Sequence, residues 1–125
     1  MRALRFKYLW LFGGFCLVGL LLYSTLTPPG PAPAMMNDKV AHALAFLILM
    51  VWFCGVYELR KAPFVAFALL LLGIAIEFFQ GQTGYRSAEL ADGLADLAGI
   101  ALGWVMAATG LQYWAIRIES WLVPK

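Results

Sequence analysis

Residues Tyr8 to Leu26 read YLWLFGGFCLVGLLLYSTL, a run of nineteen residues without a charge. A helix that crosses a bilayer needs about 20 apolar residues, so this run predicts a transmembrane helix. It also exceeds the ~7–15-residue apolar core of a secretory signal peptide. We therefore expect this segment to be retained as the first helix of a membrane protein.

The composition of the whole chain agrees with this expectation. Of its 125 residues, 63% are hydrophobic and 13% are charged, whereas about 25% of the residues in a soluble domain are charged. A chain of this length cannot bury so much apolar surface in water, which excludes a soluble globular domain. The net charge of +2 gives no basic footprint for nucleic acid. Cys16 and Cys54 lie in apolar runs and are interpreted as small buried hydrophobic residues.

Apolar runs recur along the chain and predict an all-α membrane protein, a four-helix bundle in a single domain over residues 1–125. The predicted spans are residues 8–26, 40–57, 64–79 and 94–111. Residues 112–125 are expected to form a short amphipathic helix at the membrane interface. Its apolar face would consist of Trp114, Ile118, Trp121 and Leu122, with Arg117, Glu119 and Ser120 elsewhere.

The distribution of Lys and Arg predicts the orientation. Only Lys39 and Arg86 fall on one side of the predicted spans, and the other seven basic residues fall on the opposite side. Because the side richer in Lys and Arg faces the cytoplasm, both termini are expected there. The Pro-rich linker 27–34 and the linker 81–91 would then lie outside.

This topology gathers polar residues from three helices at the outer end of the bundle. They occur in pairs spaced three or four residues apart, so each pair shares one helical face. The pairs are Asp38 and His42, Glu77 and Gln80, and Asp92 and Asp96. The deepest three, His42, Glu77 and Asp96, are the candidate acid–base residues. The candidate ligand-binding residues are Asp38, Lys39, Gln80, Arg86 and Asp92.

Small residues at every fourth position predict a close helix–helix contact in the last span. They are Ala95, Gly99, Gly103 and Ala107. The acidic pair of the same span lies next to this face. We therefore expect the two carboxylates to face the bundle and not the lipid.

Three ordered motifs of the outer cluster resemble those of the VanZ-like membrane proteins. The stretch NDKVAH, Asn37 to His42, resembles their DK-x-x-H opening, and EFFQ, Glu77 to Gln80, resembles their E-x-x-Q. Their R-x5-D-x3-N/D-x2-G-x3-G segment is matched by Arg86, Asp92, Asp96, Gly99 and Gly103.

The match departs from the family at two positions. Asp96 stands where Asn is common, and Phe46 stands where Tyr is often found. The resemblance implies a multi-pass protein of the bacterial cytoplasmic (inner) membrane. It also implies a link to antibiotic resistance, since the name-giving member is linked to low-level resistance to the glycopeptide teicoplanin.

The leading functional hypothesis is a cell-envelope protein whose outward-facing acidic pocket binds, and could also modify, an envelope lipid or its head group. In it, Arg86 and Lys39 would hold an anionic group such as phosphate. A helix-packing module that binds a second copy or another membrane protein is the first alternative, and a proton- or ion-coupled transporter is the second. The simplest interpretation is that these polar residues have a purely structural role, in which they cap helices and hold loops by hydrogen bonds and ion pairs. One histidine with several carboxylates suits a hard or borderline metal cation, but no dense metal-binding motif is present, so neither a metal nor a cofactor is expected. The sequence leaves open whether the protein is an enzyme.

Overall fold

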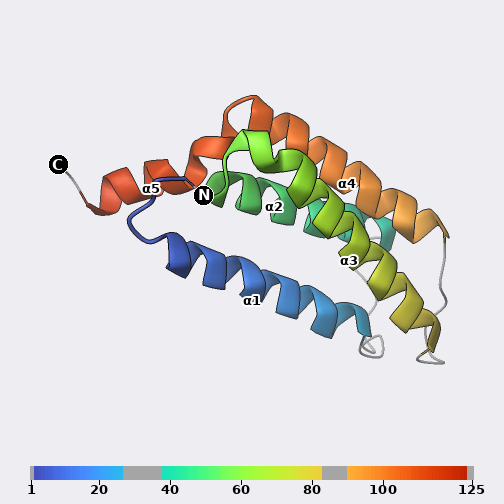
Figure 1. The fold of residues 1–125 in the computed structure, drawn as a ribbon. Coiled ribbons are helices and arrows are strands. Elements are labelled where there is room, and N and C mark those ends of the chain that lie inside the picture. Colours follow the sequence, from blue (N-terminus) through green and yellow to red (C-terminus); the bar gives the residue numbers. More distant parts are fainter. Residues whose placement is uncertain (1, 27–37, 83–89, 124–125) are drawn as a thin grey trace.

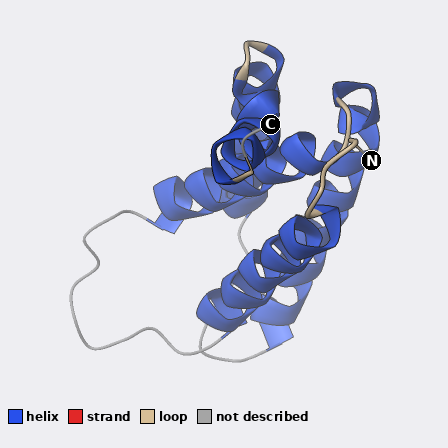
Figure 2. Ribbon diagram, turned by 90° about the vertical axis from the view of Figure 1, so that its left-hand side faces the viewer, coloured by secondary structure: helices blue, strands red, loops and turns tan. Residues whose placement is uncertain are grey.

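The structure is a computed structural model that describes residues 2–26, 38–82 and 90–123. All regular structure within these ranges is helical (Figure 2), which confirms the predicted all-α class. Two single 3₁₀ turns, Leu59–Lys61 and Leu111–Tyr113, connect helices. The α-helices are α1 (Lys7–Leu26), α2 (Asp38–Val56), α3 (Ala62–Gln82), α4 (Leu90–Ala108) and α5 (Trp114–Leu122).

The four long helices, α1 to α4, are each long and apolar enough to cross a membrane. Their bounds differ from the predicted spans by at most four residues, because polar residues at a helix end can continue its hydrogen bonding. α4 begins at Leu90, so Asp92 lies in its first turn and is not its N-cap. α4 ends at Ala108, just before Gly110, whose φ of 133° is unfavourable for residues with a side chain.

Helix α2 lies at the centre of the bundle and contacts each of the other α-helices (Figure 1). In the candidate spans, 44% of the residues of α2 are buried, against 17% of those of α1. α2 and α4 run in the same direction, and α1 and α3 run in the opposite direction (Figure 1). As a result, α2 and α4 begin, and α1 and α3 end, at the same end of the bundle.

The contact between α2 and α4 depends on glycine. A Cβ atom on Gly99 would overlap the carbonyl oxygen of Ala43, and one on Gly103 would lie 2.8 Å from the carbonyl oxygen of Leu47. Gly99, Gly103 and Ala107 are buried, whereas Ala95 is half-buried. The small-residue face of α4 is therefore covered by α2 of the same chain, and it is not free to bind a partner.

Helix α5 contacts the protein through residues that lie outside its predicted apolar face. Ala115 and Glu119 are its buried residues, whereas Trp121 and Leu122 are 77% and 64% exposed. The Glu119 carboxylate accepts hydrogen bonds from the backbone N–H groups of Arg5 (2.7 Å) and Phe6 (2.8 Å). It also accepts one from the indole N–H of Trp10, at 2.7 Å.

Glu119 lies outside the predicted apolar face of the tail, as its spacing indicates, but no pattern in the sequence indicates that its carboxylate is buried. Its carboxylate binds N–H groups at the start of α1, where a helix has unpaired donors and a partial positive charge. This carboxylate is supplied by a residue more than 110 positions away in the sequence. Helical periodicity cannot reveal such a partner.

Aromatic residues complete this junction of three helices. Trp114 of α5 packs against Trp10 of α1, with ring centroids 5.3 Å apart, and against Trp52 of α2, at 4.4 Å. Its indole N–H donates to the carbonyl oxygen of Val51, at 2.9 Å. The Arg2 guanidinium donates to Gln112 Oε1 at 2.7 Å and joins the N-terminal segment to the 3₁₀ turn before α5. Residues before α1 and the α5 region therefore meet at one end of the bundle (Figure 1).

Replacement of Glu119 by Gln should lower the free energy of unfolding by about 1–3 kcal/mol near pH 7, because charge-assisted hydrogen bonds are lost. Burial raises the pKa of Glu119, but the hydrogen bonds from Phe6, Trp10 and Arg5 outweigh it and hold the pKa below its ordinary value. The stabilisation is then complete above the unfolded-state pKa, about 4.3. It is lost as the pH falls through the lower folded-state pKa.

Unfolding of wild type and Glu119→Gln in detergent between pH 7 and pH 3 measures this difference. It should be largest near pH 7 and become smaller toward the acid end. Glu58→Gln is the matched control, because Glu58 forms an exposed ion pair with Arg60 and should contribute only about 0–1 kcal/mol. A difference between wild type and Glu119→Gln that stays constant over this range would contradict the assignment.

Candidate functional site

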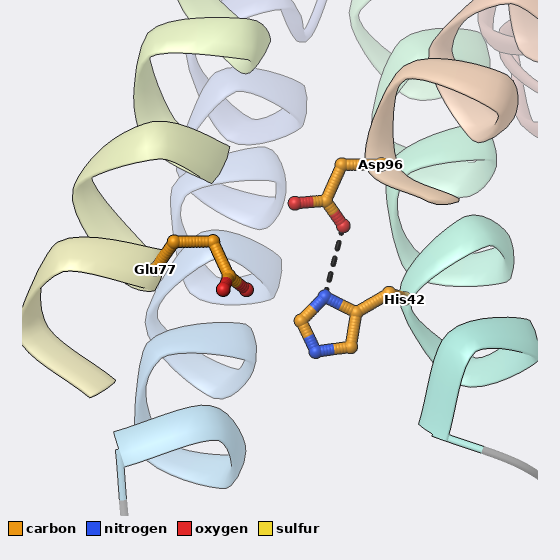
Figure 3. Close-up of side chains that lie close together, drawn as sticks. All are labelled: His42, Glu77 and Asp96. Atoms are coloured by element: carbon orange, nitrogen blue, oxygen red, sulfur yellow. Dashed lines mark hydrogen bonds and ion pairs between the residues drawn. The ribbon is translucent and has the colours of Figure 1, made fainter. Parts of the chain in front are cut away.

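Three long helices bring His42, Glu77 and Asp96 together (Figure 3). His42 lies one turn inside α2, Glu77 lies five residues before the end of α3, and Asp96 lies in the second turn of α4. α2 and α4 begin at the end of the bundle where α3 ends, so the three side chains occupy similar depths. The common depth that was inferred from the sequence is present in the structure.

The three side chains form a compact and mostly buried cluster. His42 Nδ1 lies 2.9 Å from Asp96 Oδ1 in a hydrogen bond, and the two side chains are 8% and 1% exposed. One ligand atom from each of His42, Glu77 and Asp96 lies within 4.8 Å of the other two. The cluster therefore combines one imidazole and two carboxylates in one small volume.

The hydrogen bond to Asp96 orients the imidazole of His42. Because a carboxylate is an acceptor, Nδ1 carries the hydrogen, and the lone pair of a neutral ring is then on Nε2. Figure 3 shows Nε2 on the opposite side of the ring from Asp96, toward the start of α2. A carboxylate that fixes the tautomer of a histidine in this way is a recurring arrangement in acid–base and metal sites.

The second carboxylate oxygen of Asp96 lies in a space that a glycine provides. Asp96 Oδ2 is buried and forms no hydrogen bond with the residues that the structure describes. A Cβ atom on Gly73 of α3 would lie 2.8 Å from this oxygen. Gly73 was not singled out in the sequence. Its position four residues before Glu77, on the same face of α3, is the signal that could have identified it.

An ion pair lies one turn nearer the end of the bundle. Lys39 Nζ is 3.8 Å from Asp92 Oδ1, and the two side chains are 46% and 11% exposed. Lys39 thus brings a positive charge close to the buried acidic cluster. Asp92 and Asp96 lie on one face of α4, as their spacing predicts.

Gln80 lies apart from this arrangement and joins two helices. Its side chain is 2% exposed, and its amide N–H donates to the carbonyl oxygen of Thr25 at 2.9 Å. Thr25 lies in the last turn of α1, where backbone carbonyl groups lack partners within the helix. Gln80 therefore connects the end of α1 to α3. Arg86 and the side chain of Asp38, both predicted to bind ligand, lie outside the described residues.

The charges of the cluster require compensation. Two ionised carboxylates about 4–5 Å apart repel each other by roughly 3–4 kcal/mol at an effective dielectric constant of ~20. His42 is a neutral donor to Asp96 unless it takes up a proton, and Lys39 is already near Asp92. Among the described residues, the buried Asp96 carboxylate has only the hydrogen bond with His42, through Oδ1. A carboxylate in this setting favours a proton, a metal cation or a cationic group as its ligand.

These features define an all-α protein with four candidate membrane spans and a buried histidine–carboxylate cluster at one end of its bundle. No family model matches the chain, and no solved structure matches it. The chain is 31% identical over 123 residues to Uncharacterized protein C11E3.10 of Schizosaccharomyces pombe. This alignment covers 94% of the chain and 71% of the yeast protein. The chain belongs to the same family as this yeast protein.

Replacement of Asp96 and replacement of His42 should have different effects on the free energy of unfolding. Asp96→Asn keeps an oxygen acceptor for His42 and removes a buried charge, so its free energy of unfolding should equal or exceed that of wild type. His42→Ala leaves the Asp96 carboxylate without its hydrogen-bond donor and should lower the free energy of unfolding by about 1–3 kcal/mol. Chemical unfolding in detergent that contains EDTA measures both.

The double variant His42→Ala with Asp96→Ala is the control for this pair. Because both polar partners are then absent, it should recover part of the stability that His42→Ala loses. If Asp96→Asn proved as unstable as His42→Ala, the ionised carboxylate would be a structural requirement of the fold, and a ligand-binding role would lose its main support.

Proposed function

We propose that this is a multi-pass membrane protein that binds the head group of a membrane lipid at the cluster of His42, Glu77 and Asp96. The observation that carries the proposal is the 2.9 Å hydrogen bond between His42 and Asp96, buried between apolar helices with Glu77 beside it. Ionisable groups within a membrane-spanning bundle are energetically costly, and they commonly mark functional sites.

The depth of the cluster supports a lipid head group as the ligand. Glu77 lies five residues from the end of α3, which at 1.5 Å per residue is about 8 Å along the helix. The hydrocarbon core of a bilayer is about 30 Å thick, and the polar head-group regions add several ångströms on each side. A cluster at this depth lies close to the boundary between acyl chains and head groups.

An apolar groove supports a lipid further. It lies between α1 and α2, has a volume of about 180 Å³ and is lined by Leu17, Leu20, Leu21, Ser24, Ala45, Ile48 and Leu49. Ala45 and Leu49 follow His42 by three and seven residues, so all three lie on one face of α2. An acyl chain in this groove would place its head group near His42.

The arrangement of the cluster supports acid–base chemistry on the bound head group. Asp96 holds the hydrogen on His42 Nδ1, which makes Nε2 the basic atom of the ring. Glu77 supplies a second titratable group from the opposite helix. His42 and Glu77 would exchange protons with a hydroxyl or ammonium group of the ligand.

Both termini are proposed to lie on the cytoplasmic side. The excess of Lys and Arg at the end of the bundle that carries α5 supports this orientation. We also propose that the protein is VanZ-like, that it lies in the bacterial cytoplasmic membrane and that it has a part in glycopeptide resistance. The relative from fission yeast supports none of these three points.

Labelling of single cysteines tests the orientation. In a variant with Cys16 and Cys54 replaced by Ser, Gln82→Cys and Arg117→Cys would be exposed at opposite ends of the bundle. In intact spheroplasts, a membrane-impermeant maleimide should label Gln82→Cys, and it should label Arg117→Cys only after permeabilisation. The reverse pattern would show that the orientation is wrong.

Binding of short-chain phospholipids tests the function. Lipids with one acyl composition and different head groups (phosphatidic acid, phosphatidylglycerol, phosphatidylethanolamine and phosphatidylcholine) are titrated against the purified full chain. Wild type should prefer one head group by at least about tenfold, equivalent to ~1.4 kcal/mol. Glu77→Gln and Asp96→Asn should lose this preference.

Glu58→Gln is again the control, because it removes a carboxylate from the opposite end of the bundle. It should retain the preference of the wild type. Equal binding of all four head groups, or wild-type selectivity in Asp96→Asn, would show that the cluster does not bind a head group.

A further inference from the structure

We infer that His42, Glu77 and Asp96 form a binding site for one divalent cation of the Zn²⁺ and Mn²⁺ class. The inference deepens the proposed function, on which it rests, because the cation would be the element of the site that binds an anionic lipid head group. Three features of the cluster support this cation: its set of donor atoms, the buried oxygen of Asp96 that lacks a donor among the described residues, and the negative charge of its carboxylates.

The donor set suits such a cation. One imidazole nitrogen and two carboxylate oxygens converge from α2, α3 and α4, with one ligand atom of each within 4.8 Å of the others. Zn²⁺ binds nitrogen and oxygen ligands at about 2.0–2.2 Å, so neighbouring ligand atoms lie about 3–3.5 Å apart. The 2.9 Å between His42 Nδ1 and Asp96 Oδ1 is already near this range. Rotation about the side-chain bonds of Glu77 would bring in the third ligand.

The Asp96 carboxylate provides an independent indication of a ligand. The residue is 1% exposed, and its Oδ2 atom is buried without a hydrogen bond to any described residue. This oxygen packs against Gly73, where a Cβ atom would lie 2.8 Å away. Figure 3 shows the carboxylate directed toward the region between α3 and α2, where Glu77 and His42 lie. A buried carboxylate oxygen without a donor is rare in folded proteins, and a bound ion would account for it.

The charge of the cluster points in the same direction. Glu77 and Asp96 together carry a formal charge of −2 when ionised, and a single divalent cation neutralises it. The cation would take the place of the hydrogen on His42 Nδ1, so that imidazole and carboxylate bind it side by side, and the ring hydrogen would then be on Nε2, so His42 would not act as a base while the cation is bound. A cation accounts for the buried Asp96 carboxylate more fully than the hydrogen bond from His42 alone, because that bond reaches only Oδ1.

The ligand types favour particular cations. Imidazole nitrogen together with carboxylate oxygen suits Zn²⁺ and Mn²⁺, whereas Mg²⁺ and Ca²⁺ are bound mainly by oxygen. Three protein ligands also leave at least one coordination position open. A phosphate oxygen of a lipid head group would occupy that position, with Lys39 one turn away on α2. An acidic cluster could in this way bind an anionic group.

Cation binding is measured first, without added lipid. The full chain is purified in detergent, stripped with EDTA and dialysed against Zn²⁺, Mn²⁺, Mg²⁺ or Ca²⁺. Elemental analysis should find about one Zn²⁺ or Mn²⁺ per chain and much less Mg²⁺ or Ca²⁺. At a hundredfold excess over Kd, the bound cation should raise the unfolding midpoint by roughly 5–10 °C.

Two ligand variants and one control make the measurement specific. Asp96→Asn and Glu77→Gln should each weaken Zn²⁺ binding by more than about tenfold, since loss of groups that only orient a ligand already costs 10–100-fold. Glu58→Gln should bind Zn²⁺ as the wild type does. A folded wild type that binds no cation, or Asp96→Asn that binds Zn²⁺ with wild-type affinity, would overturn the inference.

Lipid titration with and without the cation separates this inference from the proposed function. Head-group selectivity that disappears with EDTA and returns with Zn²⁺ supports both. Selectivity that persists unchanged in EDTA overturns the cation as the element that binds the head group, while the proposed function stands. Stoichiometric Zn²⁺ binding by wild type without head-group selectivity supports the cation site and refutes the lipid function.

Discussion

The close approach of α4 to α2 is the constraint on which the rest of the structure depends. Gly99 and Gly103 bring the backbones of these parallel helices together, against Ala43 and Leu47. Their positions determine both the rotation of α4 and its register along α2. With this register, Asp96, three residues before Gly99, faces His42, one residue before Ala43. The polar pair at the centre of the site thus follows from a packing contact between two glycines and a neighbouring backbone.

Helix α1 is held by polar contacts at both of its ends. It is the least buried of the four candidate spans, and the hydrophobic effect gives no driving force for helix association inside a bilayer. At its start, Glu119 binds backbone N–H groups, and at its end Thr25 accepts a hydrogen bond from Gln80. Trp52 also donates to the carbonyl oxygen of Trp10. In the histidine–carboxylate cluster, by contrast, a buried oxygen of Asp96 has no donor among the described residues.

Much of the candidate site could be predicted, because depth in the membrane follows from position along each helix. His42, Glu77 and Asp96 were the deepest polar residues of their spans, and the structure places them together. Gln80 had the same sequence signal but joins α3 to α1, and Gly73 had no signal except its spacing from Glu77. Glu119 was placed outside the apolar face of the tail, but its burial was not foreseen, because a periodic pattern shows which residues share a face and not which distant segment that face contacts.

The sequence by itself determined the all-α class, the four apolar spans and the gathering of acidic residues at one end of the bundle. These properties depend on residues that are close together in the chain, since the length of an apolar run and the period of a helix are local. Only the tertiary structure decided that Asp96 binds His42, that Gln80 binds Thr25 and that Glu119 binds the start of α1. Each of these contacts joins residues at least 54 positions apart. They depend on the rotation and register of packed helices, which no single segment specifies.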